Sequence, residues 1–373
     1  MTTRLLTVED LTVTFTARGR RDVTAVSGVS FDIGAGEVVG LVGESGCGKS
    51  VTSLALMGLL PRRGVRTGGR ALLDGSTDLL ALDDARIRDL RGTQLAMVFQ
   101  DPLSSLNPVV PIGVQVTEIL RRHRGLRGER ARAEAAHLLD RVGIPDPARR
   151  LKEYPHQLSG GMRQRALIAM AVACAPRLLI ADEPTTALDV TIQAQILELL
   201  RELVDQEGTA LLMITHDLGV VAGLCDRVNV LYAGKVVEAA ARRPLFAAPA
   251  HPYTHGLLAS IPRLDAPRGQ PLKPIRGSVN DTIAWAEGCA FAPRCDHFSP
   301  ACLEGTPAQA PAPDAAVPGP RSHLVRCVHP VNTATAPDAA RRDGQPRPGH
   351  PPHPPSEPPG AAPAASATKE KAE

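Results

Sequence analysis

The sequence predicts an α/β fold around a buried parallel β-sheet, with an antiparallel β subdomain, a helical subdomain and a small cysteine-containing C-terminal extension. Three short apolar runs, Val38–Val42, Leu178–Ala181 and Ala210–Ile214, are typical of strands that are buried on both faces. Each run leads into a helix-like stretch, and this alternation indicates parallel strands joined by helices.

The elements around these strands follow from local patterns. Leu11–Phe15 and Val23–Ile33 are β-rich or alternate between apolar and polar residues, which predicts antiparallel strands near the N-terminus. Residues 101–160 are charged and interrupted by prolines, and they indicate an inserted helical subdomain with a helix at Gly128–Val142. The clearest helix is Val190–Asp205, because its apolar residues recur at helical spacing.

The composition is that of a globular protein whose main partner is not nucleic acid. Of the 373 residues, 43% are hydrophobic and 22% are charged. The 42 basic and 39 acidic side chains leave a net charge of +3, too balanced for a polyanion-binding surface. No apolar run approaches the roughly 20 residues of a transmembrane helix, and Met1–Asp10 lacks the features of a signal peptide. We therefore expect a cytoplasmic protein that meets the membrane only through partners.

One segment carries a phosphate-binding motif. Residues 43–50 match G-x-x-x-x-G-K-S/T, follow the buried strand and open the apolar stretch Val51–Leu60. Glycines let backbone amides face phosphate oxygens, and the helix N-terminus adds its positive dipole end. Lys49 is expected to reach the β- and γ-phosphates of ATP, and the Ser50 hydroxyl to bind Mg²⁺. The expected nucleotide contacts here are Gly43, Glu44, Ser45, Gly46, Cys47, Gly48, Lys49, Ser50 and Val51.

Acidic residues end the second buried strand. Asp182 and Glu183 stand where the carboxyl end of a parallel strand faces the ligand crevice. Asp182 suits a Mg²⁺ ligand, and Glu183 suits the general base that activates water. His216 follows the third strand at the same sheet edge, and we expect it to contact the γ-phosphate and orient the water.

A second glycine-containing motif, which can form another anion site, resembles the signature of a known family. The run Leu158-Ser159-Gly160-Gly161-Met162-Arg163-Gln164-Arg165 resembles the signature L-S-G-G-x-x-x-R of ABC ATPases, a class of P-loop NTPases. In that family the signature faces the phosphate loop of a second subunit, with ATP between them. The resemblance implies ATP contacts at Ser159, Gly160, Gly161 and Gln164.

Other family elements occur in the same order. Gln100 resembles the glutamine that senses Mg²⁺ and couples to membrane subunits, and Asp189 resembles the loop that communicates across the dimer. Phe15 lies where the family places an aromatic residue that stacks on adenine, although a strand core residue is the alternative. The resemblance implies an ATPase domain over residues 1–240, with its helical subdomain at about 101–165.

The branch within the family is indicated by three further stretches. Phe99–Pro108, Leu188–Gln195 and His251–Thr254 resemble the ATPases of oligopeptide and dipeptide importers, a pattern that nickel and glutathione importers share. The resemblance implies an ATPase on the cytoplasmic face of the inner membrane. Its partners would be two transmembrane permease subunits, an extracytoplasmic solute-binding protein and a second ATPase, a paralogue or another copy. A soluble ABC ATPase without permeases is the rival, and a catalytically inactive regulatory subunit is a third possibility.

The chain continues beyond this domain with an extension, residues 241–330, and a tail, residues 331–373. The tail holds ten prolines in 43 residues and is predicted to be disordered. The extension carries four of the seven cysteines, namely Cys289, Cys295, Cys302 and Cys327. Four thiolates suit Zn²⁺ or a 4Fe–4S cluster, and the spacings fit no common zinc pattern. Cys289-x₅-Cys295 resembles the iron–sulfur extension of some peptide-importer ATPases. We expect a 4Fe–4S cluster, with Zn²⁺ or unliganded thiols as alternatives.

Overall fold

The main β-sheet contains all three predicted buried strands. The computed structural model describes residues 4–16, 19, 22–186, 188–261, 274–278, 288–313 and 322–331. Within these ranges the sheet has the order β11-β12-β10-β9-β3-β8-β7-β6, and the strands from β9 to β6 are parallel. The strands are β3 Val38–Val42, β6 Leu95–Val98, β7 Leu178–Asp182, β8 Ala210–Thr215, β9 Arg227–Tyr232, β10 Lys235–Ala241, β11 Ala310–Pro311 and β12 Leu324–Val325.

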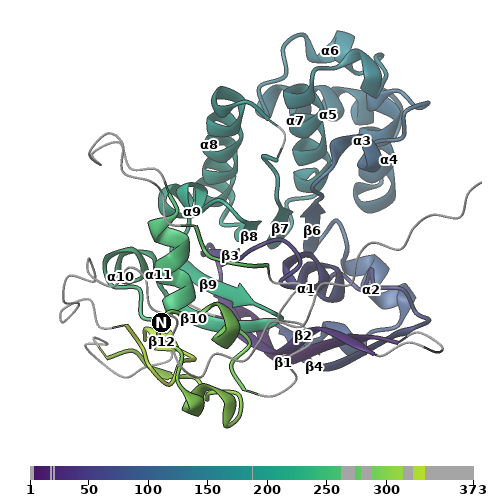
Figure 1. The fold of residues 1–373 in the computed structure, drawn as a ribbon. Helices are drawn as coiled ribbons and strands as arrows, with labels where there is room; N and C mark the ends of the chain where they lie inside the picture. Colours follow the sequence, from purple (N-terminus) through teal and green to yellow (C-terminus); the bar gives the residue numbers. More distant parts are fainter. Residues whose placement is uncertain are drawn as a thin grey trace, which may run out of the picture. The chain divides into compact units, whose positions relative to one another are not determined.

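A smaller antiparallel sheet is built mainly from the N-terminal segment, as predicted. Its order is β2-β1-β4-β5 (Figure 1). The strands are β1 Arg4–Phe15, β2 Val23–Gly34, β4 Val65–Leu73 and β5 Thr77–Asp78.

The predicted helical insertion lies between β6 and β7 in the chain. The helix expected at Gly128–Val142 is α5, and the one expected at Val190–Asp205 is α8. Figure 1 shows α3 to α7 grouped beyond the end of β6. The helices are α1 Lys49–Leu56, α2 Asp84–Leu90, α3 Pro102–Ser105, α4 Ile112–Arg124, α5 Gly128–Arg141, α6 Pro147–Arg150, α7 Gly160–Val172, α8 Val190–Glu207, α9 Leu218–Leu224, α10 Arg242–Ala247 and α11 Pro252–Ala259. The 3₁₀ helices are η1 Leu79–Ala81, η2 Pro155–Gln157, η4 Ala292–Arg294 and η5 Pro300–Leu303.

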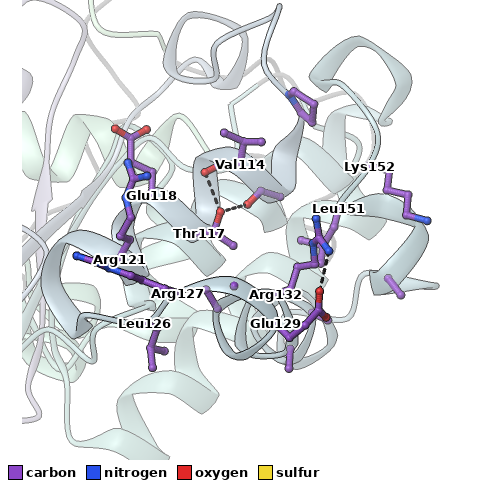
Figure 2. A pocket seen from close by; sticks show the side chains of 17 residues that line it. Val114, Thr117, Glu118, Arg121, Leu126, Arg127, Glu129, Arg132, Leu151 and Lys152 are labelled. Carbon is purple, nitrogen blue, oxygen red and sulfur yellow. Dashed lines mark hydrogen bonds and ion pairs between the residues drawn. The ribbon is translucent and has the colours of Figure 1, made fainter.

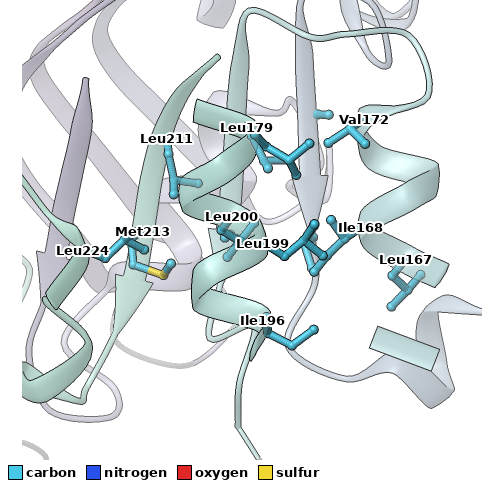
Figure 3. Close-up of a cluster of buried hydrophobic side chains, with 14 of the residues drawn as sticks. Leu167, Ile168, Val172, Leu179, Ile196, Leu199, Leu200, Leu211, Met213 and Leu224 are labelled. Carbon is cyan, nitrogen blue, oxygen red and sulfur yellow. The ribbon is translucent and has the colours of Figure 1, made fainter. Parts of the chain in front are cut away.

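The central strands divide their side chains between two apolar clusters. Alternate residues of a strand point to opposite faces, so Leu179 joins one cluster and Ile180 the other. On the first face the strands pack against α7 and α8, with Ile168, Leu199 and Leu200 among the buried contacts (Figure 3). On the second face they pack against α1 and the antiparallel sheet. Burial on both faces explains why these strands are continuously apolar.

The C-terminal extension is tied into the main sheet. β12 pairs with β10 through Glu238↔Val325 and Ala239↔Leu324, and β11 pairs with β12. Of the predicted disordered tail, Val331 alone belongs to the described residues, where its amide donates to Ala250 O at 2.7 Å. None of the helices in the described part of the chain is both long and apolar enough to cross a bilayer.

Candidate nucleotide site

The phosphate loop is a tight turn between β3 and α1. Gly48 caps α1 with φ 105°, and a Cβ atom there would lie 2.4 Å from Ala25 O. A Cβ on Gly43 would lie 2.2 Å from Leu231 O. Only glycine fits these positions, as a loop wrapped closely around an anion requires.

Lys49 is held inside this loop. Its side chain is 4% exposed, and Nζ donates to Gly43 O at 2.8 Å and to Glu44 O at 3.0 Å. The ammonium is therefore fixed within the loop, and it and the N-terminus of α1 both contribute positive potential there. The adjacent residues of the motif, Ser45 and Gly46, are exposed, whereas Cys47 is buried, and burial raises the pKa of its thiol.

Asp182 lies at the carboxyl end of β7, opposite the start of α1. Its carboxylate accepts from Ser50 Oγ at 3.2 Å and from Ser53 Oγ at 3.4 Å. Burial raises the pKa of Asp182 above its usual value. Ser53 was not predicted from the sequence; its signal is its position three residues after Ser50, on the same face of a helix.

Glu183 is the centre of a polar cluster. Its Oε1 lies 3.2 Å from His216 Nδ1 and 3.9 Å from Lys49 Nζ. Its Oε2 accepts from Gln100 Nε2 at 3.1 Å and from Thr186 Oγ1 at 3.0 Å. The strands β6, β7 and β8 thus bring three expected residues together at one sheet edge. Thr186 is a further neighbour that the sequence analysis did not single out.

These side chains suit Mg²⁺ and a polyphosphate. The Ser50 hydroxyl, the Asp182 carboxylate and the Gln100 amide supply oxygen donors, which Mg²⁺ prefers. The loop amides and Lys49 supply donors for phosphate oxygens. The donor set therefore fits Mg²⁺-ATP.

The signature segment lies at the start of α7. Ser159 is the N-cap, and its Oγ accepts from Met162 N at 3.3 Å. A Cβ on Gly161 would lie 2.8 Å from Ile192 Cγ2, so the glycine allows α7 to approach α8 closely. Gln164 is 1% exposed, and its Nε2 has no hydrogen-bond partner among the described residues.

Two expected nucleotide contacts lie outside this cluster. Asp189 caps α8, because its Oδ1 accepts from Ile192 N at 3.0 Å. Phe15 ends β1 and is half-buried against the second apolar cluster.

The four extension cysteines neighbour one another. The pKa of Cys295 is raised to about 12, mainly by burial and to a smaller extent by the nearby thiols of Cys327, Cys289 and Cys302. Two backbone amides donate to sulfur, His297 N to Cys295 Sγ at 3.4 Å and His329 N to Cys327 Sγ at 3.3 Å. Thiol ligands and amide donors suit a thiolate cluster. However, no group of three or more His, Cys, Asp or Glu side chains among the described residues is arranged to hold a metal ion.

A separate groove of about 1120 Å³ lies on the helical subdomain (Figure 2). Val114, Thr117 and Arg121 of α4 face Glu129 and Arg132 of α5 across it. None of the predicted nucleotide-site residues lines this groove.

Two protein families and many known proteins match this chain in sequence. A family described as "ABC transporter" matches residues 26–186, and one described as "Oligopeptide/dipeptide transporter, C-terminal region" matches residues 237–302. The dipeptide transport ATP-binding protein DppD of Bacillus subtilis (strain 168) is 50% identical over 324 residues, 87% of this chain and 94% of the relative. The oligopeptide transport ATP-binding protein OppD of Salmonella typhimurium (strain LT2) is 50% identical over 309 residues, 83% of this chain and 91% of the relative.

Solved structures give the same result for the fold. A dimeric structure of the ATP-binding cassette MJ0796 bound to ADP and Pi has a TM-score of 0.57 and 30% identity. It covers 64% of this chain and 99% of that chain.

Proposed function

The chain belongs to the ATP-hydrolysing subunits of ABC transporters, and from this premise we propose that it energises an importer of dipeptides or oligopeptides. The observation that carries the proposal is the cluster of Lys49, Asp182, Glu183 and His216 at one sheet edge. The match of the extension to a peptide-transporter region supports the cargo class.

The proposed mechanism assigns each side chain a role. Lys49 binds phosphate oxygens, and Ser50, Asp182 and Gln100 would hold Mg²⁺, which neutralises phosphate charge when bound. Glu183 accepts a proton from the attacking water at its carboxylate, and His216 orients that water. Their hydrogen bonds pre-position both groups before nucleotide arrives.

The site requires a second subunit in this proposal. α7 packs beside β6, which is three strands from β3, or roughly 14 Å at the usual strand spacing. Ser159 is therefore too far from the phosphate loop of its own chain to touch the same phosphate. We infer that the signature completes the site of a paralogous ATPase or another copy, with Asp189 at the junction. MJ0796 is itself described as dimeric.

The transporter would comprise two permease subunits and an extracytoplasmic binding protein, with this chain bound peripherally at the cytoplasmic face. Uptake of labelled dipeptides, tripeptides, nickel and glutathione tests the cargo in cells that lack the chain. The wild-type chain should restore peptide uptake, and Glu183→Gln should not. Restored nickel or glutathione uptake without peptide uptake would refute the peptide cargo. A chain that purifies with ribosomes and without permeases would refute the transport role.

We also propose that the four cysteines bind a 4Fe–4S cluster that stabilises the extension. All seven cysteines are free thiols, and the four in question come together from residues 289 to 327. Anaerobically purified protein should contain iron and acid-labile sulfide, and Cys295→Ser should lose both, whereas Cys174→Ser should keep them. Zinc without sulfide would replace the proposal with a zinc site, and neither element would leave unliganded thiols.

A further inference from the structure

The C-terminal extension reaches the phosphate loop through one side chain. Arg294 Nη1 donates to Glu44 Oε2 and Nη2 to Oε1, both at 3.0 Å, which makes a bidentate ion pair. Arg294 ends η4, directly before Cys295, and Glu44 is the second residue of the phosphate loop. The side chains are only 5% and 27% exposed, so water screens the pair weakly.

The surroundings hold the guanidinium in one position. Arg294 Nε donates to Arg276 O at 2.6 Å, and Nη1 also donates to Tyr232 Oη at 3.2 Å. The guanidinium carbon lies 5.7 Å from the centre of the Tyr232 ring and 5.9 Å from that of Phe291. These contacts are typical of a cation that is fixed by aromatic rings.

Glu44 is fixed through its backbone as well. Its amide donates to Tyr253 Oη at 2.9 Å, and its carbonyl accepts from Lys49 Nζ at 3.0 Å. Tyr253 is the second residue of α11 and packs edge-on against Tyr232, with the ring centres 4.7 Å apart. Every polar group of Glu44 is thus engaged, two of them by residues beyond position 250.

The charge of Glu44 explains why such a contact matters. A carboxylate in a loop that binds a polyphosphate repels its ligand. In a partly buried setting, one unpaired like charge beside the ligand is expected to weaken binding roughly tenfold or more. A paired arginine cancels this repulsion and keeps the carboxylate turned toward the extension.

We propose that Arg294 is a positioning residue of the ATP site, which neutralises Glu44 and holds the phosphate loop in its anion-binding shape. The extension is therefore a part of the nucleotide site as well as an attachment to the sheet. The inference rests on the ATP binding of the proposed function and is independent of the cargo and of any metal in the extension.

The test is a double-variant cycle in the full-length chain. The dissociation constant of a fluorescent ATP analogue and the kcat and KM of hydrolysis are compared for wild type, Arg294→Met, Glu44→Gln and the double variant. Arg294→Met should raise the dissociation constant and KM roughly tenfold with little change in kcat. Glu44→Gln should lower the dissociation constant, because Arg294 is then an unpaired cation beside the loop. The double variant should recover most of the affinity that Arg294→Met loses, because no unpaired carboxylate remains.

Matched controls separate this role from a structural one. Arg243→Met replaces an exposed arginine of α10 in the same extension and should leave ATP affinity unchanged. Unchanged affinity in Arg294→Met overturns the inference, as does a double variant that binds no better than Arg294→Met. Lys49→Ala should bind no ATP in any case. A wild type that binds no ATP would refute the proposed function and the inference with it, whereas the other outcomes leave the proposed function intact.

Discussion

At the scale of single residues, Glu183 has a strained backbone conformation that its neighbours stabilise. It has φ 48°, a left-handed value that costs a non-glycine residue about 1–3 kcal/mol. Hydrogen bonds from Gln100 and Thr186 and the adjacent His216 offset this cost and fix the carboxylate. Backbone strain of this kind is typical of a functional site, where the position of a side chain is kept at a cost to the stability of the fold.

Replacing Glu183 by glutamine should separate ATP binding from hydrolysis. The amide keeps the shape of the side chain but cannot accept a proton, so turnover should fall at least about 100-fold while ATP affinity is retained. Phosphate release and nucleotide binding are the measurements. Glu202→Gln, on the exposed face of α8, is the matched control and should hydrolyse ATP normally. Unchanged turnover in Glu183→Gln would rule out Glu183 as the base.

The buried carboxylate of Asp182 should lower the free energy of unfolding at neutral pH when nucleotide and Mg²⁺ are absent. Because burial raises its pKa above the usual 3.8, the folded state binds a proton more tightly than the unfolded state. The free energy of unfolding therefore falls as the pH rises from 3.8 through the raised pKa. Asp182→Asn should be more stable than wild type at neutral pH, and the difference should vanish near pH 3.8.

Ligand binding should reverse this order of stability. Mg²⁺-ATP at about 100 times its Kd should stabilise the wild type by about 2.7 kcal/mol, and Asp182→Asn by less. Thermal unfolding with and without Mg²⁺-ATP measures both effects. Asp89→Asn, exposed on α2, should match the wild type throughout. A variant that is less stable than wild type without ligand would contradict the argument.

At the scale of elements, sequence patterns predicted the central strands β3, β7 and β8 and the strands β1 and β2 near the N-terminus, but not β6 or β9. The strand β9 was not predicted, because Arg227 stands at its start and Asn229 interrupts its apolar residues. Arg227 is tolerated there because it pairs with Asp32 at 3.0 Å and with Glu37 at 3.3 Å, both far away in the sequence. Periodicity within one segment contains no information about such partners.

The start of α1 should tolerate only glycine at its N-cap. Gly48→Ala would introduce a Cβ 2.4 Å from Ala25 O at φ 105°, so we expect a loss of about 1–3 kcal/mol in stability and loss of ATP binding. Gly223→Ala in α9 is the matched control, because no atom lies within 4 Å of its Cβ and its φ is not positive. That variant should gain up to about 1 kcal/mol. Chemical denaturation measures both, and a Gly48→Ala variant as stable as wild type would contradict the packing argument.

At the scale of the whole molecule, the site joins segments that a local pattern cannot connect. Motifs predicted Lys49, which opens the helix after β3, and Asp182, Glu183 and His216, which lie at the carboxyl ends of β7 and β8. They did not predict that the extension contacts the phosphate loop. Glu44 and Arg294 are 250 positions apart, and no single motif contains both residues. Long-range ion pairs of this kind depend on the completed fold.

Sharing of the active site should make hydrolysis depend on protein concentration. If Ser159 completes the site of another subunit, a single chain contains no complete site, and turnover requires association. The specific activity of the isolated chain should therefore rise with its concentration until dimers are saturated. Ser159→Ala should lower that activity while each chain still binds ATP, with a loss of about 1 kcal/mol in stability from the missing N-cap.

The form of the concentration dependence distinguishes the possible partners. A specific activity that rises with concentration indicates pairing between copies of this chain. An activity that stays low at every concentration and increases when a paralogous ATPase and the permeases are added indicates an obligate mixed dimer. Full activity that is independent of concentration, in a preparation that remains monomeric by light scattering, would show that one chain suffices. That result would contradict the shared site, in which α7 packs against β6, three strand spacings away from the β3 strand that precedes the phosphate loop.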